Sequence, residues 1–189
     1  MRYSLSHKQE TRERLLQSSA SSAKRSGFAS IGVDGLMKAI GLSGGAFYGH
    51  FSSKDELFGA IVERELSQSL ARLGGEGQPS LAQLERCLKL YLSMSHVEQA
   101  EDGCALPALG AEIARAEMAV RERAEDWMCR LQQRWAQALG SESLAWSILS
   151  QCVGALVVAR MMSTPALQRQ VLKSSHDEIS RQIGQSSPQ

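Results

Sequence analysis

The stretch that decides the fold runs from Val33 to Lys54 and reads VDGLMKAIGLSGGAFYGHFSSK. Its first part carries apolar residues at helical spacing, and Gly41 then allows the left-handed backbone that a tight turn requires. Ser43 follows as a candidate N-cap for a short second helix over residues 44–50. Two helices joined by such a turn form a helix-turn-helix, which places its second helix in the major groove of DNA.

The segments on both sides also carry apolar residues at helical spacing. This spacing predicts helices over residues 8–26, 33–40, 44–50, 54–73, 80–96, 105–116, 117–139, 142–163 and 166–183. The clearest linker is GGEGQP at residues 74–79. Aromatic residues make up only 5% of the 189 residues, whereas Ala, Leu and Gln are plentiful. This composition favours helices over strands, so we expect an all-α protein.

The charge is distributed unevenly between the two parts of the chain. Residues 1–60 hold eight Lys or Arg against five acidic residues, whereas the remainder holds 13 against 15 and the whole chain carries +1. This mild basic excess lies in the segment that is expected to face DNA.

The four cysteines do not form a metal-binding pattern. They are widely spaced, with no CxxC pair and no histidine at zinc-ligand spacing, at Cys87, Cys104, Cys129 and Cys152. The N-terminal segment lacks the apolar core of a signal peptide, which favours free thiols and a cytoplasmic location. The most apolar run, Cys152–Ala159, is shorter than the ~20 residues that span a bilayer, so no membrane partner is expected.

The sequence carries no pattern typical of an enzyme. It has no glycine-rich phosphate loop, no pair of metal ligands and no nucleophile elbow. We therefore expect neither an enzymatic activity nor a cofactor.

The segment from Gly27 to Leu57 resembles the TetR/AcrR (tetracycline-repressor) family of bacterial transcriptional regulators. The matching positions have fixed spacing and are Gly27-Phe28, Val33, Leu36, Gly41-Leu42-Ser43, Gly45, Phe47-Tyr48, His50-Phe51, Ser53-Lys54 and Leu57. The resemblance implies a three-helix helix-turn-helix head that binds DNA, over residues 1–53. It also implies a helical effector-binding and dimerisation bundle over residues 54–189.

The resemblance further implies roles for residues of the head. Phosphate contacts are expected from Tyr48, His50 and Lys54, with Lys38 as a further candidate, and such contacts set the register on DNA rather than read its sequence. The start of the recognition helix, which faces the base edges, comprises Ser43, Gly44, Gly45 and Ala46. The small core of the head is expected to contain Val33, Leu36, Leu42, Phe47 and Phe51.

The recognition helix departs from the family in its first residues. Many members carry a basic or polar residue where this chain has Gly44, and Thr where it has Ala46. A glycine cannot read a base edge through a side chain, so specificity is expected to rest on backbone approach, on Ala46 and on DNA shape.

Ligand sites in helical bundles lie between helices and are mostly apolar. The candidate ligand contacts in the body are Tyr91, Met94, Cys104, Trp127, Met128, Trp135 and Met161. The alternative is that these Met and Trp residues form core stripes. Cys104 is a sharper hypothesis because a helix N-terminus lowers a thiol pKa, and some relatives with Gly-Cys at this point sense electrophiles or oxidants. Its alternative is a small buried structural residue.

The last two predicted helices suggest a second copy of the chain as a partner. Helix 142–163 is apolar on more than one side, so a homodimer through helices 142–163 and 166–183 is the simplest cover. The dimer would set two recognition helices ~34–36 Å apart on a pseudo-palindromic operator. We therefore expect a repressor that a small-molecule or electrophile effector releases from double-stranded DNA. The alternative is a helical interaction or ligand-binding protein with weak or lost DNA binding.

Overall fold

The computed structural model describes residues 5–74 and 77–186, and within these ranges every regular element is a helix. The all-α expectation is therefore confirmed; residues 75 and 76 of the predicted linker lie outside the described ranges. The α-helices are α1 (Leu5–Ser26), α2 (Val33–Ala39), α3 (Lys54–Gly74), α4 (Leu81–Tyr91), α5 (Met94–Glu98), α6 (Leu106–Ala114), α7 (Met118–Leu139), α8 (Glu142–Met161) and α9 (Pro165–Ser186). Two 3₁₀ helices are η1 (Gly44–Gly49) and η2 (Ala100–Asp102).

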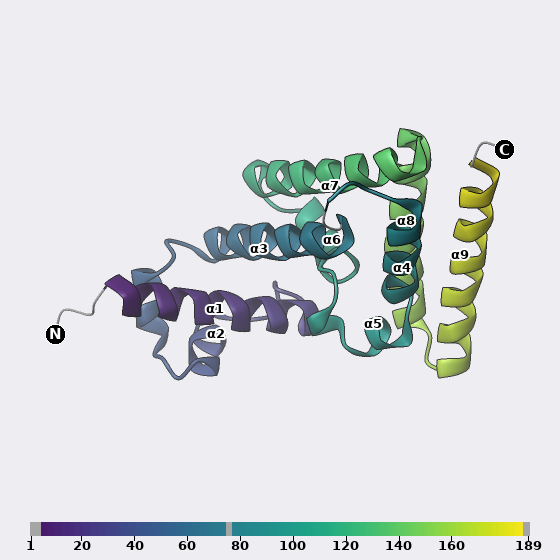
Figure 1. Ribbon diagram of the computed structural model, residues 1–189. Coiled ribbons are helices and arrows are strands. Elements are labelled where there is room, and N and C mark those ends of the chain that lie inside the picture. The colour runs from purple at the N-terminus through teal and green to yellow at the C-terminus, as the bar shows by residue number, and fades with distance from the viewer. Residues whose placement is uncertain (1–4, 75–76, 187–189) are drawn as a thin grey trace.

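The helices form a small head at one end of the molecule and a larger bundle behind it (Figure 1). The α1, α3 and α7 helices run alongside one another, and α2 lies beside α1 at the end that holds the N-terminus. At the other end α8 and α9 run side by side, with α9 outermost. The strongest packing is of α3 on α7, α7 on α8 and α8 on α9.

The core of the head contains most of the residues that the sequence predicts. Leu36, Phe47 and Phe51 are buried, and Val33 is half-buried against them. Leu42 is a correction, because its side chain is 37% exposed instead of filling the core. Met37, which is fully buried, takes that place, and its carbonyl accepts the Leu42 N–H at 2.9 Å.

The predicted helix over residues 80–96 is wrong as a single element. The α4 helix ends at Tyr91 and α5 begins at Met94, because Ser93 between them has an extended backbone (φ −118°, ψ 157°). The Ser93 hydroxyl donates to the Leu90 carbonyl at 2.7 Å, which is the local bonding by which serine competes with a helix.

The predicted recognition helix is a 3₁₀ helix. Its tighter bonds include Ala46 N–H to the Ser43 carbonyl at 3.0 Å and His50 N–H to the Phe47 carbonyl at 2.8 Å. Ser43 stands at the N-cap as expected, but its side chain makes no capping bond. A six-residue element that starts with two glycines has little intrinsic preference for an α-helix, which explains the short 3₁₀ form.

The α8 helix is long and apolar enough to cross a membrane, and it is the only such helix in the described ranges. Length and composition alone also fit a core helix of a bundle, and 39% of its most apolar window is buried inside this fold. The packing of α8 against both α7 and α9 covers two of its apolar sides, while Trp146, Val157, Val158 and Met161 remain partly exposed.

Candidate DNA interface and body cavity

The short η1 helix separates a buried aromatic residue from an exposed one. Phe47 is fully buried, whereas its neighbour Tyr48 is 69% exposed and meets the Phe47 ring edge-on with centroids 5.4 Å apart. Ser43 and Gly45 are also exposed, Gly44 and Ala46 are half-buried, and Lys38 on α2 is exposed. The predicted DNA face is therefore accessible, and Phe47 anchors it to the core of the head.

Gly44 lies against a side chain of α2, and its backbone angles do not demand glycine. A Cβ at this position would overlap the carboxylate of Asp34, which stands at the start of α2. A larger residue here would displace Asp34 from its place. Asp34 is exposed and the contact is with the end of its side chain, so it can turn away from a larger residue at position 44.

Lys54 already has partners within the head. Its ammonium donates to the Ala29 carbonyl at 3.1 Å and lies 4.8 Å from the centroid of the Phe28 ring. These contacts join the start of α3 to the turn between α1 and α2. Its contact with phosphate stays a prediction.

His50 is half-buried at the end of η1, and its Nδ1 atom is buried with no hydrogen-bond partner within the described residues. Burial lowers the pKa of His50, and the nearby positive charges of Lys8 and Arg12 lower it further. The ring is therefore neutral near pH 7, and it would meet a phosphate as a hydrogen-bond donor rather than as a cation.

A cavity of about 340 Å³ lies in the body between α3, α4, α5 and the segment around η2. Tyr91 and Cys104, two of the predicted ligand contacts, both line it. The sequence interpretation missed its other walls, which include Ser69, Arg72, Leu73, Leu90, His96 and Asp102. Single Ser, Leu and Arg residues carry no signal of their own, and His96 stood out only as one of four scattered histidines.

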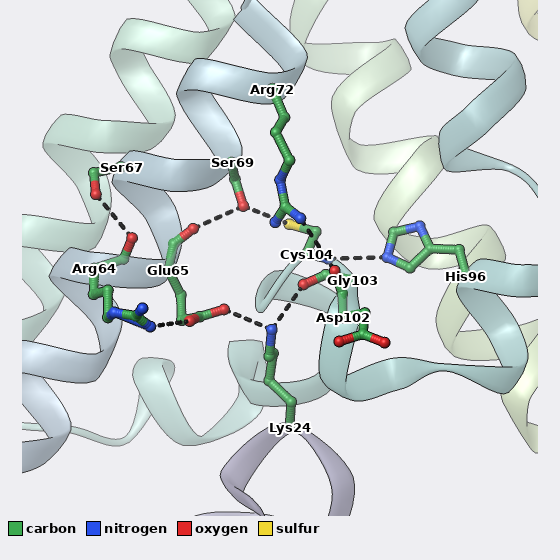
Figure 2. Close-up of polar contacts among 10 residues, drawn as sticks. All are labelled: Lys24, Arg64, Glu65, Ser67, Ser69, Arg72, His96, Asp102, Gly103 and Cys104. Atoms are coloured by element: carbon green, nitrogen blue, oxygen red, sulfur yellow. Dashed lines mark hydrogen bonds and ion pairs between the residues drawn. The ribbon is translucent and has the colours of Figure 1, made fainter. Parts of the chain in front are cut away.

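His96 is held in one tautomer at the wall of this cavity (Figure 2). Its Nε2 atom accepts the backbone N–H of Cys104 at 3.0 Å, so the ring proton is on Nδ1, which donates to the Tyr91 carbonyl at 2.8 Å. Burial lowers the pKa of His96, although the bond to the Tyr91 carbonyl acts in the opposite direction. The neutral ring thus links α5 to the segment that precedes α6.

Cys104 is enclosed by hydroxyl groups. Its side chain is buried, and the Ser69 hydroxyl lies 3.5 Å from the sulfur as a donor. The phenol of Tyr91 is also buried, and burial, followed by the proximity of Cys104, raises the Tyr91 pKa well above its usual value. This wall of the cavity therefore carries a hydroxyl group of Ser69, the thiol of Cys104 and the phenol of Tyr91, which stays neutral.

The remaining predicted ligand contacts are dispersed. Met128 lines a second, mostly apolar opening of about 620 Å³ between α6, α7 and α8. Neither hollow is lined by Met94, Trp127, Trp135 or Met161. Trp135 is buried and donates to the Leu73 carbonyl at 3.0 Å, Trp127 lies under the Arg130 guanidinium, and Met161 is exposed.

A helix-turn-helix head on an all-α body defines a class of DNA-binding regulators, and the comparisons identify the family. Residues 15–61 match the family described as "Bacterial regulatory proteins, tetR family". No curated protein matches the chain.

Solved structures extend the similarity to the whole chain. The reduced form of NemR from E. coli is 20% identical and has a TM-score of 0.76, with 91% of this chain and 96% of that one covered. A TetR transcriptional regulator from Legionella pneumophila is 17% identical with a TM-score of 0.76, covering 97% and 100%. A TetR transcriptional regulator from Chloroflexus aurantiacus J-10-FL is 24% identical with a TM-score of 0.76, covering 96% and 98%.

The head therefore belongs to the tetR family of bacterial regulatory proteins, and the whole chain has the fold of TetR-family transcriptional regulators. The resemblance found in the sequence is confirmed.

Proposed function

We propose that this chain is a ligand-responsive transcriptional repressor of the cytoplasm that acts without a cofactor. Residues 1–53 would bind a pseudo-palindromic operator, and residues 54–189 would bind an effector and join two copies into a homodimer. The observation that carries the proposal is the exposed face around Tyr48 on a head that matches the tetR family. The alternative is a helical interaction or ligand-binding protein with weak or lost DNA binding, and the glycines at the start of η1 support it.

The DNA-binding part is tested by selecting duplexes from a random pool and measuring affinity against salt. Lys38→Gln should weaken binding to all duplexes and reduce the salt slope by about one phosphate contact. Tyr48→Phe should also weaken binding to all duplexes but leave the salt slope unchanged, because it removes a neutral hydrogen-bond donor. Lys89→Gln, on the exposed side of α4, is the matched control and should leave both quantities unchanged. A wild-type protein that enriches no duplex would favour the alternative.

The effector that fits the cavity between α3, α4 and α5 is compact and uncharged in its buried part. His96 is neutral there because burial lowers its pKa, and Tyr91 is neutral because burial raises its pKa. The charged residues that line the cavity, Arg72 and Asp102, are exposed to solvent. A charged ligand group beside the buried His96 and Tyr91 would therefore lose its hydration without gaining an opposite charge there. The Tyr91 hydroxyl, which is buried without a hydrogen-bond partner among the described residues, can instead donate to a neutral oxygen. The Ser69 hydroxyl already donates to the Glu65 carbonyl at 2.9 Å. A thermal-shift screen with small neutral carbonyl and hydroxyl compounds tests this proposal, because a bound ligand raises the melting temperature.

The second candidate effector is an electrophile that would react with Cys104. The thiol would add across an activated double bond, with sulfur bonding to one carbon and its proton passing to the other. We compare operator binding before and after N-ethylmaleimide in a Cys87→Ser/Cys129→Ser background, because those two thiols are more exposed than Cys104. Binding should fall on treatment and persist in the additional Cys104→Ser variant. Equal loss in both proteins would leave Cys104 as a buried structural residue.

The homodimer is proposed to form through the predicted helices 142–163 and 166–183, which correspond to α8 and α9. Large apolar side chains remain exposed there, at Trp146, Val157, Val158, Met161 and Leu167. Those on α8 fall within one broad stripe at helical spacing, and a second copy would remove them from water. The two heads would then face successive turns of the operator, ~34–36 Å apart.

A further inference from the structure

The segment from Gly103 to Glu112 is bound to the head at both of its ends. At its start, the Gly103 carbonyl accepts a hydrogen bond from the Lys24 ammonium of α1 at 3.1 Å. At its end, the Glu112 carboxylate accepts the backbone N–H groups of Phe28 at 2.9 Å and of Ala29 at 2.8 Å. Both anchor points on the head lie where α1 ends and the turn to α2 begins.

The anchor at Lys24 is rigid because it is a buried ion pair. The Lys24 ammonium lies 2.6 Å from the Glu65 carboxylate of α3, and the two side chains are only 5% and 4% exposed. Figure 2 shows Lys24 reaching up between Glu65 and Gly103. A buried cation needs all its acceptors, so a shift of the Gly103 carbonyl would draw Lys24 with it or leave it underbonded.

The same peptide unit forms part of the cavity wall. Gly103 and Cys104 both line the cavity of about 340 Å³. The Cys104 N–H is held by His96, and a Cβ at Gly103 would overlap the His96 ring. The peptide between Gly103 and Cys104 thus has the cavity and His96 on one side and Lys24 on the other. A ligand that pushes His96 or Gly103 acts directly on a bond to the head.

The anchor at Glu112 lies at the entrance to the helix-turn-helix. Phe28 stacks on Phe58 of α3 with centroids 4.7 Å apart, and Lys54 lies over the Phe28 ring. Gly27 has a left-handed backbone (φ +81°), and a Cβ there would come 3.1 Å from the Glu112 carboxylate. The turn is therefore closely fitted to α6, so a movement of α6 is passed to the residues that lead into α2.

We infer that Lys24 and Glu112 are positioning residues that couple the cavity to the DNA-binding head through the segment 103–112. Neither residue touches the ligand or the DNA; each keeps the head in register with the cavity wall. This inference rests on the proposed function, because it explains how an effector in the cavity changes the affinity for an operator.

Gly103→Ala tests the coupling without a known effector, because the added methyl group pushes His96 as a ligand would. The test is a double-mutant cycle with Glu112→Ala, read as affinity for a duplex selected with the wild-type protein. Gly103→Ala should weaken binding on the order of tenfold when Glu112 is present, within the usual range of coupling between sites. In the Glu112→Ala background the same change should have less than about a third of that effect. Glu117→Ala is the matched control, since Glu117 is exposed and makes no capping bond, and it should preserve the full effect.

Hydrogen exchange gives a second readout that needs no DNA. Gly103→Ala should accelerate exchange of the Phe28 and Ala29 amides, and the acceleration should persist with Glu117→Ala. If Gly103→Ala does not fold, His96→Ala disturbs the same peptide from the cavity side and takes its place in the cycle. An equal loss of DNA affinity with and without Glu112, together with unchanged exchange at Phe28 and Ala29, would overturn the inference. A wild-type protein that binds no selected duplex would instead overturn the proposed function.

Discussion

Among single residues, two glycines of the helix-turn-helix differ in backbone conformation and in what a side chain at their position would meet. Gly41 has a left-handed backbone (φ +77°) with open space around the position of a Cβ, so only its conformation demands glycine. Gly44 has no such backbone, and Asp34 fills the space where a Cβ would stand. The left-handed backbone of Gly41 follows from the pattern of a turn, whereas the contact at Gly44 depends on which side chain packs opposite.

Gly41→Ala should lower the free energy of unfolding by about 1–2 kcal/mol, because an L-residue is strained in the left-handed region. Gly110→Ala is the control, because Gly110 lies in the interior of α6 with open space around it and the substitution should change stability in the opposite direction. It should raise the free energy of unfolding by about 0.5–1 kcal/mol, since glycine weakens a helix interior. Urea unfolding of both variants measures this, and a loss of stability in both would contradict the role assigned to the backbone of Gly41.

His96 should make stability depend on pH in a defined direction. Its pKa is lowered in the folded protein, so the unfolded chain takes up the proton first as pH falls from about 6.5. Stability is therefore fully present above that pH and declines below it until the folded ring is also protonated. Protonation would place a proton on Nε2, which faces the Cys104 N–H.

Thermal melting between pH 7.5 and pH 5.5 measures this decline. His96→Ala should have a lower melting temperature at every pH, but its melting temperature should depend less on pH. Adding His50→Ala should reduce the remaining pH dependence further, because the pKa of His50 is also lowered. An unchanged slope in His96→Ala would contradict this account.

Among the secondary-structure elements, the periodicity of apolar residues predicted where helices lie but missed an interruption between two of them. The α7 and α8 helices begin within a residue of their predicted starts, where Ser141 caps α8 through a bond to the Leu144 N–H. The break between α4 and α5 was missed, because Leu84, Leu88 and Tyr91 keep helical spacing up to it and no glycine or proline marks it. The Ser93 hydroxyl, bonded to the Leu90 carbonyl, accompanies the end of the helix, and periodicity does not register such a bond.

One buried ion pair joins α1 to α3. Lys24→Met should destabilise the protein by about 3 kcal/mol, because it leaves the buried Glu65 carboxylate with only the Arg64 guanidinium, 3.6 Å from its other oxygen. Lys24→Met/Glu65→Leu should recover much of that loss. Lys173→Met breaks an exposed pair with Asp177 on α9 and is the control, with a cost below about 1 kcal/mol. Similar losses in the buried and the exposed variant, measured by urea unfolding, would show that burial of the pair is unimportant.

In the whole molecule, the head and the α8–α9 end lie at opposite ends (Figure 1). The cavity is lined by residues of α3, α4, α5 and the segment around η2. This layout suits a regulator whose dimerisation end sets the spacing of two heads. It also places the segment 103–112 between the cavity and the head, where α6 contacts α1.

Val158→Arg should convert the proposed homodimer into a monomer, because it puts a charge on the apolar stripe of α8. Loss of the second head should weaken operator binding by about 10²-fold or more through lost avidity. Met118→Arg, at an exposed apolar position at the start of α7, should remain dimeric. Sedimentation equilibrium measures the assembly state, and a wild-type monomer that binds the operator tightly would contradict the proposed dimer.

The all-α class and the helix-turn-helix could be predicted from the sequence, because they depend on local spacing, turn glycines and the motif around Tyr48. The cavity and its connection to the head could not, because they depend on contacts between distant segments. Lys24 and Gly103 are 79 residues apart and Phe28 and Glu112 are 84 apart, and no local pattern links such pairs. The contact of Gly44 with Asp34 and the tautomer of His96 likewise arise from groups that meet only after the helices pack.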